Sequence, residues 1–431
     1  MKNTEVIIVG GGMSGLCIGY YLSRAGVGVK IIEKADNLGG LAGSVQISGI
    51  CIDKYYHHLM HSDTDALDLI EDLGLTQTIN WHTSAVSLFN GKRIYPFTTI
   101  KDILKLPIIS FKERVKYLFG MIKILTSRKH HNLNTKSVFD WTRHIFGKRV
   151  SEKMWEPLMK NRWDGVTKDI PAVWLWQRIK KRMSNRSSLF GKETLGYPEG
   201  GFCRIIEALK DSVVSNGGQI NTGDPVINIE KNADYYEVFS EKGKSRCKII
   251  ILALPFPLVT KIKSNLDSIY ETEKVPYLGT ISLILITDKP VTKYYWTNIV
   301  DDTFPFCGVI DHSNFISPEK YNGKCIAYLV KYLPQADGFW KLNDTQIKEI
   351  FISYFKKMVP EFQETDIKEY AIIRNKATHA VRDYSFFKQI DRWLNPDQNF
   401  YIINDSLIYP DDRGVDVCVK AAKIILKKIV D

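Results

Sequence analysis

Three glycines near the start of the chain have the spacing of a phosphate-binding turn. Gly10, Gly12 and Gly15 follow a short apolar run at residues 5–9. In such a turn the first glycine makes the tight bend, the second lets the backbone approach a pyrophosphate, and the third lets helix and strand pack closely. The unpaired N–H groups that open the next helix then face the phosphates. The spacing predicts one end of a dinucleotide site.

An acidic residue completes this pattern. A second apolar run, residues 27–32, ends at Glu33, which lies 18 residues after the last of the three glycines. A carboxylate in that place accepts the hydroxyl groups of an adenosine ribose. A glycine turn that serves packing alone is the alternative, but the strands, the helix and the acid all agree with cofactor binding. The candidate contacts at this end also include Met13, Ser14 and Lys34.

A second glycine pair, Gly39 and Gly40, lies six and seven residues after Glu33. The run Glu-x5-Gly-Gly-x2-Gly-Ser resembles the flavin-containing amine oxidase superfamily, which includes protoporphyrinogen oxidase, monoamine oxidase, phytoene desaturase and UDP-galactopyranose mutase. A dehydrogenase that uses only a nicotinamide cofactor does not need this pair. The resemblance therefore implies FAD, and it adds Leu41 and Ala42 to the candidate cofactor contacts.

The resemblance extends to the end of the chain. Residues 399–405 are expected to form a strand of the nucleotide domain, and a final helix runs to residue 430. In the superfamily the start of this helix faces the pyrimidine end of the flavin, where it stabilises negative charge. The superfamily's Gly-Asp pair is changed here to Asn404-Asp405. The residues that the resemblance places against FAD are Asp405, Arg413, Gly414 and Val415, with Val226 from an earlier strand.

Two histidines, His58 and His61, are the candidate catalytic residues. Their spacing would also suit a metal, but no carboxylate or cysteine lies at a matching spacing nearby, so no metal site is predicted. The run Tyr56-x-His58-x-x-His61-Ser62 resembles a segment of UDP-galactopyranose mutases that follows the flavin ring and the sugar pocket. That resemblance implies orienting roles, and buried structural histidines are the alternative.

Cations and aromatic residues farther along the chain are candidates for substrate binding. Arg178 and Arg182 lie one helical turn apart and could hold a diphosphate or carboxylate, or could be solvated surface cations. Aromatic rings with an amide beside them could stack on a sugar and hydrogen-bond to it, or could pack at a strand edge. These further candidates are Tyr294, Tyr295, Trp296 and Asn298.

Residues 304–315 resemble another mutase segment. Asp311 and His312 take the places of its Glu-His pair, which makes them candidate substrate contacts. Gly308 stands where the mutases have the arginine that holds the diphosphate. This departure counts against binding of UDP in the mutase manner.

Composition limits the class of protein. With 431 residues, two domains are expected, and a net charge of +11 with a pI near 9.0 favours an anionic partner. An acidic membrane surface and a sugar nucleotide both qualify, whereas nucleic acid is not expected because no nucleic-acid module is recognisable. A merely basic surface is the alternative. Seven scattered cysteines suit a reducing cytoplasm. Residues 101–131 form a basic amphipathic stretch that either lies at the inner membrane face or packs as a helical subdomain.

The expected fold is α/β (α+β). A Rossmann-like FAD-binding domain is built from residues 1–76, 192–262 and 396–431. A substrate-binding domain, with a mixed sheet and a helical subdomain, takes residues 77–191 and 263–395. No repeat or low-complexity segment interrupts this division.

The sequence contains no serine nucleophile elbow, Walker A turn or HExxH motif, so the chemistry is expected from the flavin. The predicted function is an FAD-dependent oxidoreductase with hydride transfer between substrate and flavin N5. The expected substrate is small, anionic and contains a sugar, free or lipid-linked, as used in surface polysaccharide biosynthesis. Two alternatives stay open: a UDP-galactopyranose mutase-like isomerase without net redox, and a non-catalytic flavin-binding module.

Overall fold

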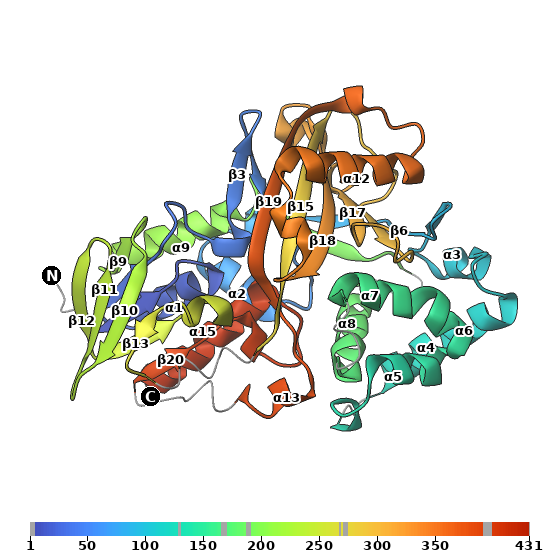
Figure 1. The fold of residues 1–431 in the computed structure, drawn as a ribbon. Coiled ribbons are helices and arrows are strands. Elements are labelled where there is room, and N and C mark those ends of the chain that lie inside the picture. Colours follow the sequence, from blue (N-terminus) through green and yellow to red (C-terminus); the bar gives the residue numbers. More distant parts are fainter. Residues whose placement is uncertain are drawn as a thin grey trace.

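The computed structural model describes residues 5–127, 131–164, 170–186, 191–266, 269, 275–390 and 399–430 (Figure 1). Residues 128–130, which belong to the predicted 101–131 stretch, lie outside this description. Two large sheets organise the described chain, with a group of helices beside the second sheet. The mixed arrangement confirms the predicted α/β fold class.

A five-stranded parallel sheet is built around the first strand. Its order is β20-β13-β1-β2-β9, so strands from the two ends of the chain lie in one sheet. The first strand is completely apolar and buried, as expected for a strand covered on both faces. The strands are β1 (Val6–Val9), β2 (Val29–Ile32), β9 (Gln219–Asn221), β13 (Ile249–Leu252) and β20 (Phe400–Ile402).

A layer of helices accompanies this sheet. Helix α1 packs against both α9 and α15, and α15 in turn contacts α2. A separate four-stranded sheet, in the order β12-β11-β10-β14, lies beside them. The elements are α1 (Met13–Arg24), α2 (Thr64–Asp72), α9 (Cys203–Ser215), α15 (Val415–Val430), β10 (Val226–Lys231), β11 (Tyr236–Ser240), β12 (Gly243–Cys247) and β14 (Lys263–Ser264).

The second large sheet has seven strands in the order β19-β15-β18-β17-β16-β6-β7. All neighbours are antiparallel except β16 and β6, which are parallel. Helix α12 (Asp344–Met358) packs on this sheet over its own apolar core. The strands are β6 (Val86–Phe89), β7 (Ile94–Pro96), β15 (Tyr277–Thr287), β16 (Trp296–Ile299), β17 (Gly308–Asp311), β18 (Cys325–Pro334) and β19 (Ile367–Ala380).

A group of helices is inserted between β7 and β8. Stacked rings of Tyr117, Phe146 and Trp155, with centroids 5.1–6.2 Å apart, hold them together. The stretch predicted as helical from residue 101 is divided near Pro107, because proline cannot donate the helical hydrogen bond. The helices are α3 (Ile100–Lys105), α4 (Phe111–Thr126), α5 (Val138–Phe146), α6 (Lys148–Val150), α7 (Glu156–Trp163) and α8 (Ala172–Ser184).

The chain passes between the two large sheets several times. The five-stranded sheet takes strands from each range proposed for the FAD-binding domain, and the seven-stranded sheet takes strands from both ranges proposed for the substrate domain. A pair of short strands, β5 (Ile79–Thr83) and β8 (Thr194–Pro198), links the two sets of ranges. Among the described helices, none has both the length and the apolar character needed to cross a membrane.

Candidate active site

The glycine turn between β1 and α1 has the geometry that its spacing predicts. Gly10 has a φ of +107°, which only glycine adopts without strain. A Cβ on Gly15 would lie 1.9 Å from the Gly10 carbonyl oxygen, so α1 can follow the turn this closely only with glycine there. A Cβ added to Gly12 would have Gly40 Cα, 3.9 Å away, as its nearest neighbour. The space beside Gly12 is therefore left open for a ligand.

The second glycine pair closes over this turn. Gly39 donates its N–H to the Gly11 carbonyl over 2.8 Å and has a φ of +99°. Gly40, with a φ of +57°, faces Gly12. Helix α1 has no side chain that caps its N-terminus. Its first N–H groups therefore remain available to an anion such as a pyrophosphate.

The acid at the end of β2 lies against the same turn. One carboxylate oxygen of Glu33 accepts the N–H of Gly11 over 2.6 Å, and the other accepts the N–H of Ala35 over 2.8 Å. The N–H of Asp224 bonds to the Glu33 carbonyl, which brings the start of β10, with Val226, beside it. Met13, Ser14 and Ala42 are buried near the turn, whereas Lys34 is exposed.

The C-terminal helix completes the opposite end of the cradle. Asp405 shares a small cavity with His379, Arg382 and Arg413. Burial raises the pKa of the Asp405 carboxyl, and the two guanidinium groups oppose that rise. No described atom comes within 4 Å of a Cβ placed on Gly414, the residue before α15. The C-terminal end of the cradle therefore also has open space, and this space lies near charged side chains.

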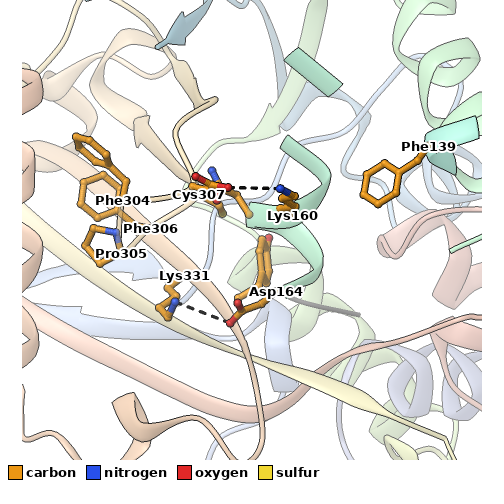
Figure 2. A pocket seen from close by; sticks show the side chains of 11 residues that line it. Phe139, Lys160, Asp164, Phe304, Pro305, Phe306, Cys307 and Lys331 are labelled. Atoms are coloured by element: carbon orange, nitrogen blue, oxygen red, sulfur yellow. Dashed lines mark ion pairs between the residues drawn. The ribbon is translucent and has the colours of Figure 1, made fainter. Parts of the chain in front are cut away.

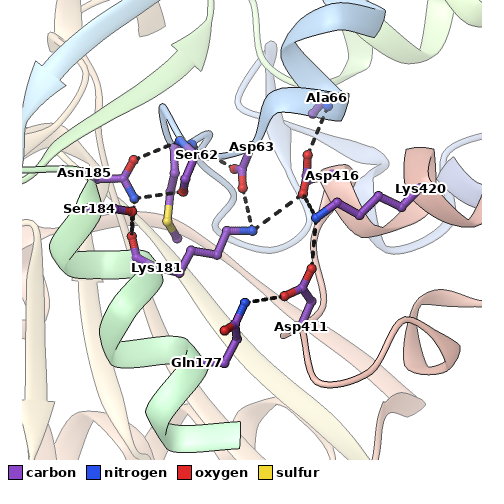
Figure 3. A network of polar contacts seen from close by, with 11 residues as sticks. Ser62, Asp63, Ala66, Gln177, Lys181, Ser184, Asn185, Asp411, Asp416 and Lys420 are labelled. Atoms are coloured by element: carbon purple, nitrogen blue, oxygen red, sulfur yellow. Dashed lines mark hydrogen bonds and ion pairs between the residues drawn. The ribbon is translucent and has the colours of Figure 1, made fainter. Parts of the chain in front are cut away.

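A polar network fixes the start of α15 (Figure 3). The ammonium group of Lys181, on α8, lies 2.6 Å from Asp63 and 3.8 Å from Asp416. Lys420 lies 2.9 Å from both Asp411 and Asp416. Three segments far apart in the sequence therefore meet where the predicted flavin motif begins.

The two candidate histidines have different surroundings. Nδ1 of His58 lies 3.3 Å from the Tyr295 hydroxyl. Burial first, and then the charge of Arg182, lower the pKa of His58 well below its usual range, so this ring is neutral. His61 is exposed and stacks on Trp81 with ring centroids 3.6 Å apart. The structure therefore does not bring the two histidines together.

Both candidate arginines have carboxylate partners within the chain. Arg182 bonds to Glu193 over 2.7 Å and lies over the Trp296 ring. Arg178 forms an ion pair with Asp412. Burial by itself would raise the pKa of Asp412, but Arg178 and a further arginine, Arg162, outweigh it and hold that pKa well below its usual range. The structure thus adds Arg162 and Asp412 to the site.

The aromatic candidates divide between two environments. Tyr295 is fully buried and reaches His58, whereas Tyr294 is half-buried near Asp102. Trp296 meets the ring of Tyr56 edge to face at 4.7 Å, and its indole N–H bonds to the Asn298 side chain over 3.0 Å. Tyr295 and Trp296 therefore contact the segment that contains His58, whereas Tyr294 lies near Asp102.

Asp311 and His312 are enclosed by the chain itself. Asp311 accepts the N–H of Thr292 over 2.8 Å, and burial raises its pKa to about 7. Nε2 of His312 lies 2.9 Å from the Tyr321 hydroxyl, and burial lowers its pKa to about 3. In the described structure the two residues hold the loop before β16 and an aromatic cluster, and neither lines the cavity described next.

A cavity of about 340 Å³ lies between the inserted helices and the seven-stranded sheet (Figure 2). Two ion pairs cross it: Lys160 with Asp302 at 3.6 Å, and Lys331 with Asp164 at 3.9 Å. The sequence patterns did not single out these residues, because each pair joins segments more than a hundred positions apart. The remaining lining residues are Phe139, Asn161, Phe304, Pro305, Phe306, Cys307 and Tyr332.

One tyrosine connects the cavity to the C-terminal motif. The Tyr332 hydroxyl lies 2.6 Å from that of Tyr56 and accepts an N–H of Arg413 over 2.9 Å. Arg162 lies over the same ring, 4.8 Å from its centroid. Tyr332 therefore separates the cavity from the residues predicted to meet the flavin ring.

A dinucleotide cradle completed by a C-terminal helix, with a second, mostly antiparallel sheet and a helical insert, defines a flavoprotein. The family model for flavin containing amine oxidoreductases matches residues 13–405. The chain belongs to this family, as its glycine motifs predict. The family implies FAD, and the open space beside Gly12 and Gly414, with the uncapped start of α1, fits that cofactor.

Known relatives are distant in sequence. The probable UDP-galactopyranose mutase of Klebsiella pneumoniae is 23% identical over 221 residues, which are 49% of this chain and 54% of the mutase. Protoporphyrinogen oxidase 2 of Arabidopsis thaliana is 23% identical over 164 residues, which are 37% of this chain and 32% of the oxidase. The matched regions thus span about half and about a third of these two relatives.

Solved structures share the fold across the whole chain. An Exiguobacterium protein described as a protoporphyrinogen oxidase has a TM-score of 0.80 at 18% identity, covering 100% of this chain and 99% of that one. Reduced UDP-galactopyranose mutase has a TM-score of 0.75 at 18% identity, covering 100% and 97%. At this level of identity the likeness shows the fold alone.

Proposed function

We propose that the protein is an FAD-dependent oxidoreductase that acts on a small, anionic, sugar-containing substrate, free or lipid-linked, in surface polysaccharide biosynthesis. The family, the fold and the cofactor cradle support the flavin chemistry. When bound, FAD supplies a hydride acceptor. The chain's own residues would hold the cofactor, orient the substrate and keep water away.

The observation that carries the substrate class is a group of partly buried cations where the inserted helices meet the C-terminal motif. Arg162, Arg178 and Arg182 come from the inserted helices, and Arg413 comes from the C-terminal motif. Two of these, Arg162 and Arg178, share the single carboxylate of Asp412. A buried cation without a full partner is unfavourable, and an anionic substrate would relieve that cost. An uncharged hydrocarbon substrate would not.

The cavity beside Tyr332 supports the sugar part of this proposal. Its wall combines aromatic rings with carboxylates, ammonium groups and one amide, Asn161. Aromatic faces stack on the C–H face of a sugar, while carboxylates and amides bond to its hydroxyl groups. At about 340 Å³ the cavity has the size of an ordinary small-molecule site.

His58 has the position of an orienting residue. It is neutral, and it lies beside Tyr295 and the charge of Arg182. A neutral imidazole can hold a hydroxyl group without adding charge to the site. His61 is exposed, so it is proposed as a residue of the outer surface of this site.

A mutase-like isomerisation is the second candidate. The likeness to reduced UDP-galactopyranose mutase and the placement of His58 favour it. The glycine at position 308 counts against it, because this buried position of β17 offers no cation to a diphosphate.

An anaerobic titration separates the two candidates. Visible absorption of the purified flavoprotein is recorded while nucleotide sugars are added singly, and the products are analysed. Bleaching of the oxidised-flavin bands by one sugar would support the oxidoreductase. Product that forms only after chemical reduction of the flavin, without net bleaching, would support the mutase. The absence of both responses to every sugar tested would contradict the proposed substrate class.

A matched pair of variants tests the role of the cations. Arg162→Gln removes a partly buried guanidinium beside the cavity, so we expect at least a tenfold weaker response to the active sugar. Arg143→Gln removes an exposed arginine that is paired with Glu156, and this variant should behave as the wild type. Equal responses from both variants would remove Arg162 from the site.

We also propose a cellular location for the protein. None of the seven cysteines, all within the described ranges, forms a disulfide, and unpaired thiols suit a reducing compartment. We place the protein in the cytoplasm, in contact with the inner membrane face through residues 101–131. Fractionation of cells into soluble and membrane pools would test this placement.

A further inference from the structure

Four large apolar side chains are exposed on two neighbouring helices of the insert. Their exposed fractions are 36% for Leu104, 65% for Phe111, 67% for Phe119 and 42% for Ile122. The remaining exposed side chains of this kind, within the described ranges, are spread over separate elements: Val214, Ile227, Leu258 and Val430. Exposed apolar groups that gather in this way mark a contact surface.

Helix α4 has two opposite apolar sides. Tyr117, Gly120 and Ile124 are buried, and Gly120 lets the helix approach the Phe146 ring closely. Successive residues of a helix are about 100° apart, which places Phe111, Phe119 and Ile122 on the opposite side. The first side accounts for packing within the insert. The second side has no packing role in the described structure.

Lysines surround this second side. Lys101, Lys105, Lys112, Lys116 and Lys123 are all exposed, and none has an ion pair with another residue that the structure describes. The two acids on these helices are occupied: Asp102 and Glu113 each accept N–H groups in a capping box at their own helix start. The surface around the apolar groups is therefore strongly positive.

We propose that this surface, the α3–α4 face, binds the interface of an anionic lipid bilayer. It comprises Leu104, Phe111, Phe119 and Ile122 with the five exposed lysines. Apolar side chains would enter the boundary between headgroups and acyl chains, while the lysines would meet the acidic headgroups. A second copy of the chain is disfavoured as the occupant, because two such faces would bring ten lysines together.

The position of the face in the molecule agrees with this role. Helices α3 and α4 lie at the end of the molecule remote from the five-stranded sheet (Figure 1). The same insert supplies Phe139 and Lys160 to the cavity beside Tyr332. Docking would therefore hold the cavity near the membrane without covering the FAD cradle. Lipid binding by this face rests on the proposed contact of residues 101–131 with the inner membrane face, but it does not depend on the identity of the substrate.

Vesicle co-sedimentation of the FAD-loaded protein tests the inference. Vesicles of phosphatidylcholine with phosphatidylglycerol should bind the wild type, and raising the salt concentration should weaken that binding. Vesicles of phosphatidylcholine alone should bind at least tenfold more weakly. No binding to either vesicle at low salt would overturn the inference.

Matched variants locate the contact. Phe111→Ser with Phe119→Ser should reduce binding to the acidic vesicles at least tenfold, and so should Lys112→Glu with Lys116→Glu. The control, Ile227→Ser, changes an exposed apolar residue of similar exposure on β10 and should bind as the wild type. Equal loss in the control, or wild-type binding by the double phenylalanine variant, would contradict the proposal.

Two further measurements distinguish lipid binding from a loss of catalytic function and from self-association. The double phenylalanine variant should retain wild-type flavin content and wild-type bleaching by the active sugar, which separates docking from the proposed catalytic function. Size-exclusion chromatography should show the same oligomeric state for wild type and variant. An oligomer that the variant abolishes would assign the face to self-association and overturn the lipid proposal.

Discussion

At the scale of single residues, Gly12 and Gly15 have different reasons to be glycine. A methyl group on Gly15 would overlap the Gly10 carbonyl, whereas one on Gly12 would meet only open space in the chain. Gly12 also has a φ of −72°, which alanine adopts freely. We therefore propose that Gly12 is glycine because of the ligand, whereas Gly15 is glycine because of the fold itself.

We expect Gly12→Ala to fold normally and to lose FAD. The apo form should unfold as the wild-type apo form does, while FAD affinity falls at least tenfold, or about 1.4 kcal/mol. Gly15→Ala should lower the stability of the apo form by about 1–3 kcal/mol, because the turn must move. Gly338→Ala, where the added methyl meets open space remote from the cradle, is the control. Full FAD retention by Gly12→Ala would contradict the cradle assignment.

A buried carboxyl predicts how stability changes with pH. Asp53 accepts the Tyr197 hydroxyl over 2.7 Å and the Phe202 N–H over 3.2 Å. Burial nevertheless raises its pKa from 3.8 to about 7. The folded state therefore keeps a proton that the unfolded state has already lost between these two values.

Stability should fall as pH rises from about 4 to about 7. The contribution of Asp53 is fully present below its unfolded pKa and is lost as pH passes through its folded pKa, at up to about 1.4 kcal/mol per pH unit. Asp53→Asn should remove part of this slope and should be the more stable protein at pH 8. Urea unfolding at pH 5 and pH 8 measures both. A variant less stable than the wild type at pH 8 would show that the ionised carboxylate is favoured.

At the scale of elements, one loop joins the inserted helices to the start of α15. Asp412 pairs with Arg178 on α8 and, at 3.5 Å, with Arg162 on α7. The indole N–H of Trp174 also reaches it over 3.4 Å. The loop leads directly into Arg413 and Gly414, so the inserted helices help to position the predicted flavin contacts.

Asp412→Asn should loosen this connection. Removing one partner of a fully buried ion pair costs about 3–5 kcal/mol, and we expect a smaller loss here because Asp412 and its two guanidinium partners are only partly buried. We expect lower thermal stability and a shift in the visible spectrum of the bound flavin. The pKa of Asp412 is lowered, so its stabilisation is present above about pH 4 and is lost as pH falls. Asp288→Asn, in an exposed ion pair, should leave both readouts unchanged. An unchanged spectrum for Asp412→Asn would limit its role to stability.

The sequence could predict those elements whose characteristic residues lie close together along the chain. The turn at Gly10, the acid at Glu33 and the amphipathic helices could be predicted, because each signal lies within about twenty residues. The pairing of His58 with Tyr295, 237 positions away, leaves no local trace. Arg178 shows a related limit: its spacing suggests a ligand, and only the fold reveals that Asp412 is also its partner.

At the scale of the whole molecule, the seven-stranded sheet is joined to the proposed FAD-binding domain by more than chain crossings. The Tyr328 hydroxyl, on the seven-stranded sheet, bonds to the carbonyl of Asp53 over 2.9 Å. Arg413, at the start of α15, donates to the Thr378 carbonyl over 2.7 Å as well as to Tyr332. Separation of the sheets would therefore leave several buried polar groups without partners, and each such group is costly.

The molecule should consequently unfold in one transition, and two independent signals can show it. All nine tryptophans fall in residues 77–191 and 263–395, so their emission reports the proposed substrate domain. Release of FAD reports the cradle. We expect both signals to change at the same temperature. Adding FAD should raise that shared temperature, since FAD at 100 times its Kd stabilises the folded state by about 2.7 kcal/mol. FAD could instead raise the temperature of its own release and leave unchanged the temperature at which tryptophan emission changes. The sheets would then be energetically independent, and the contacts of Tyr328 and Arg413 could not couple them.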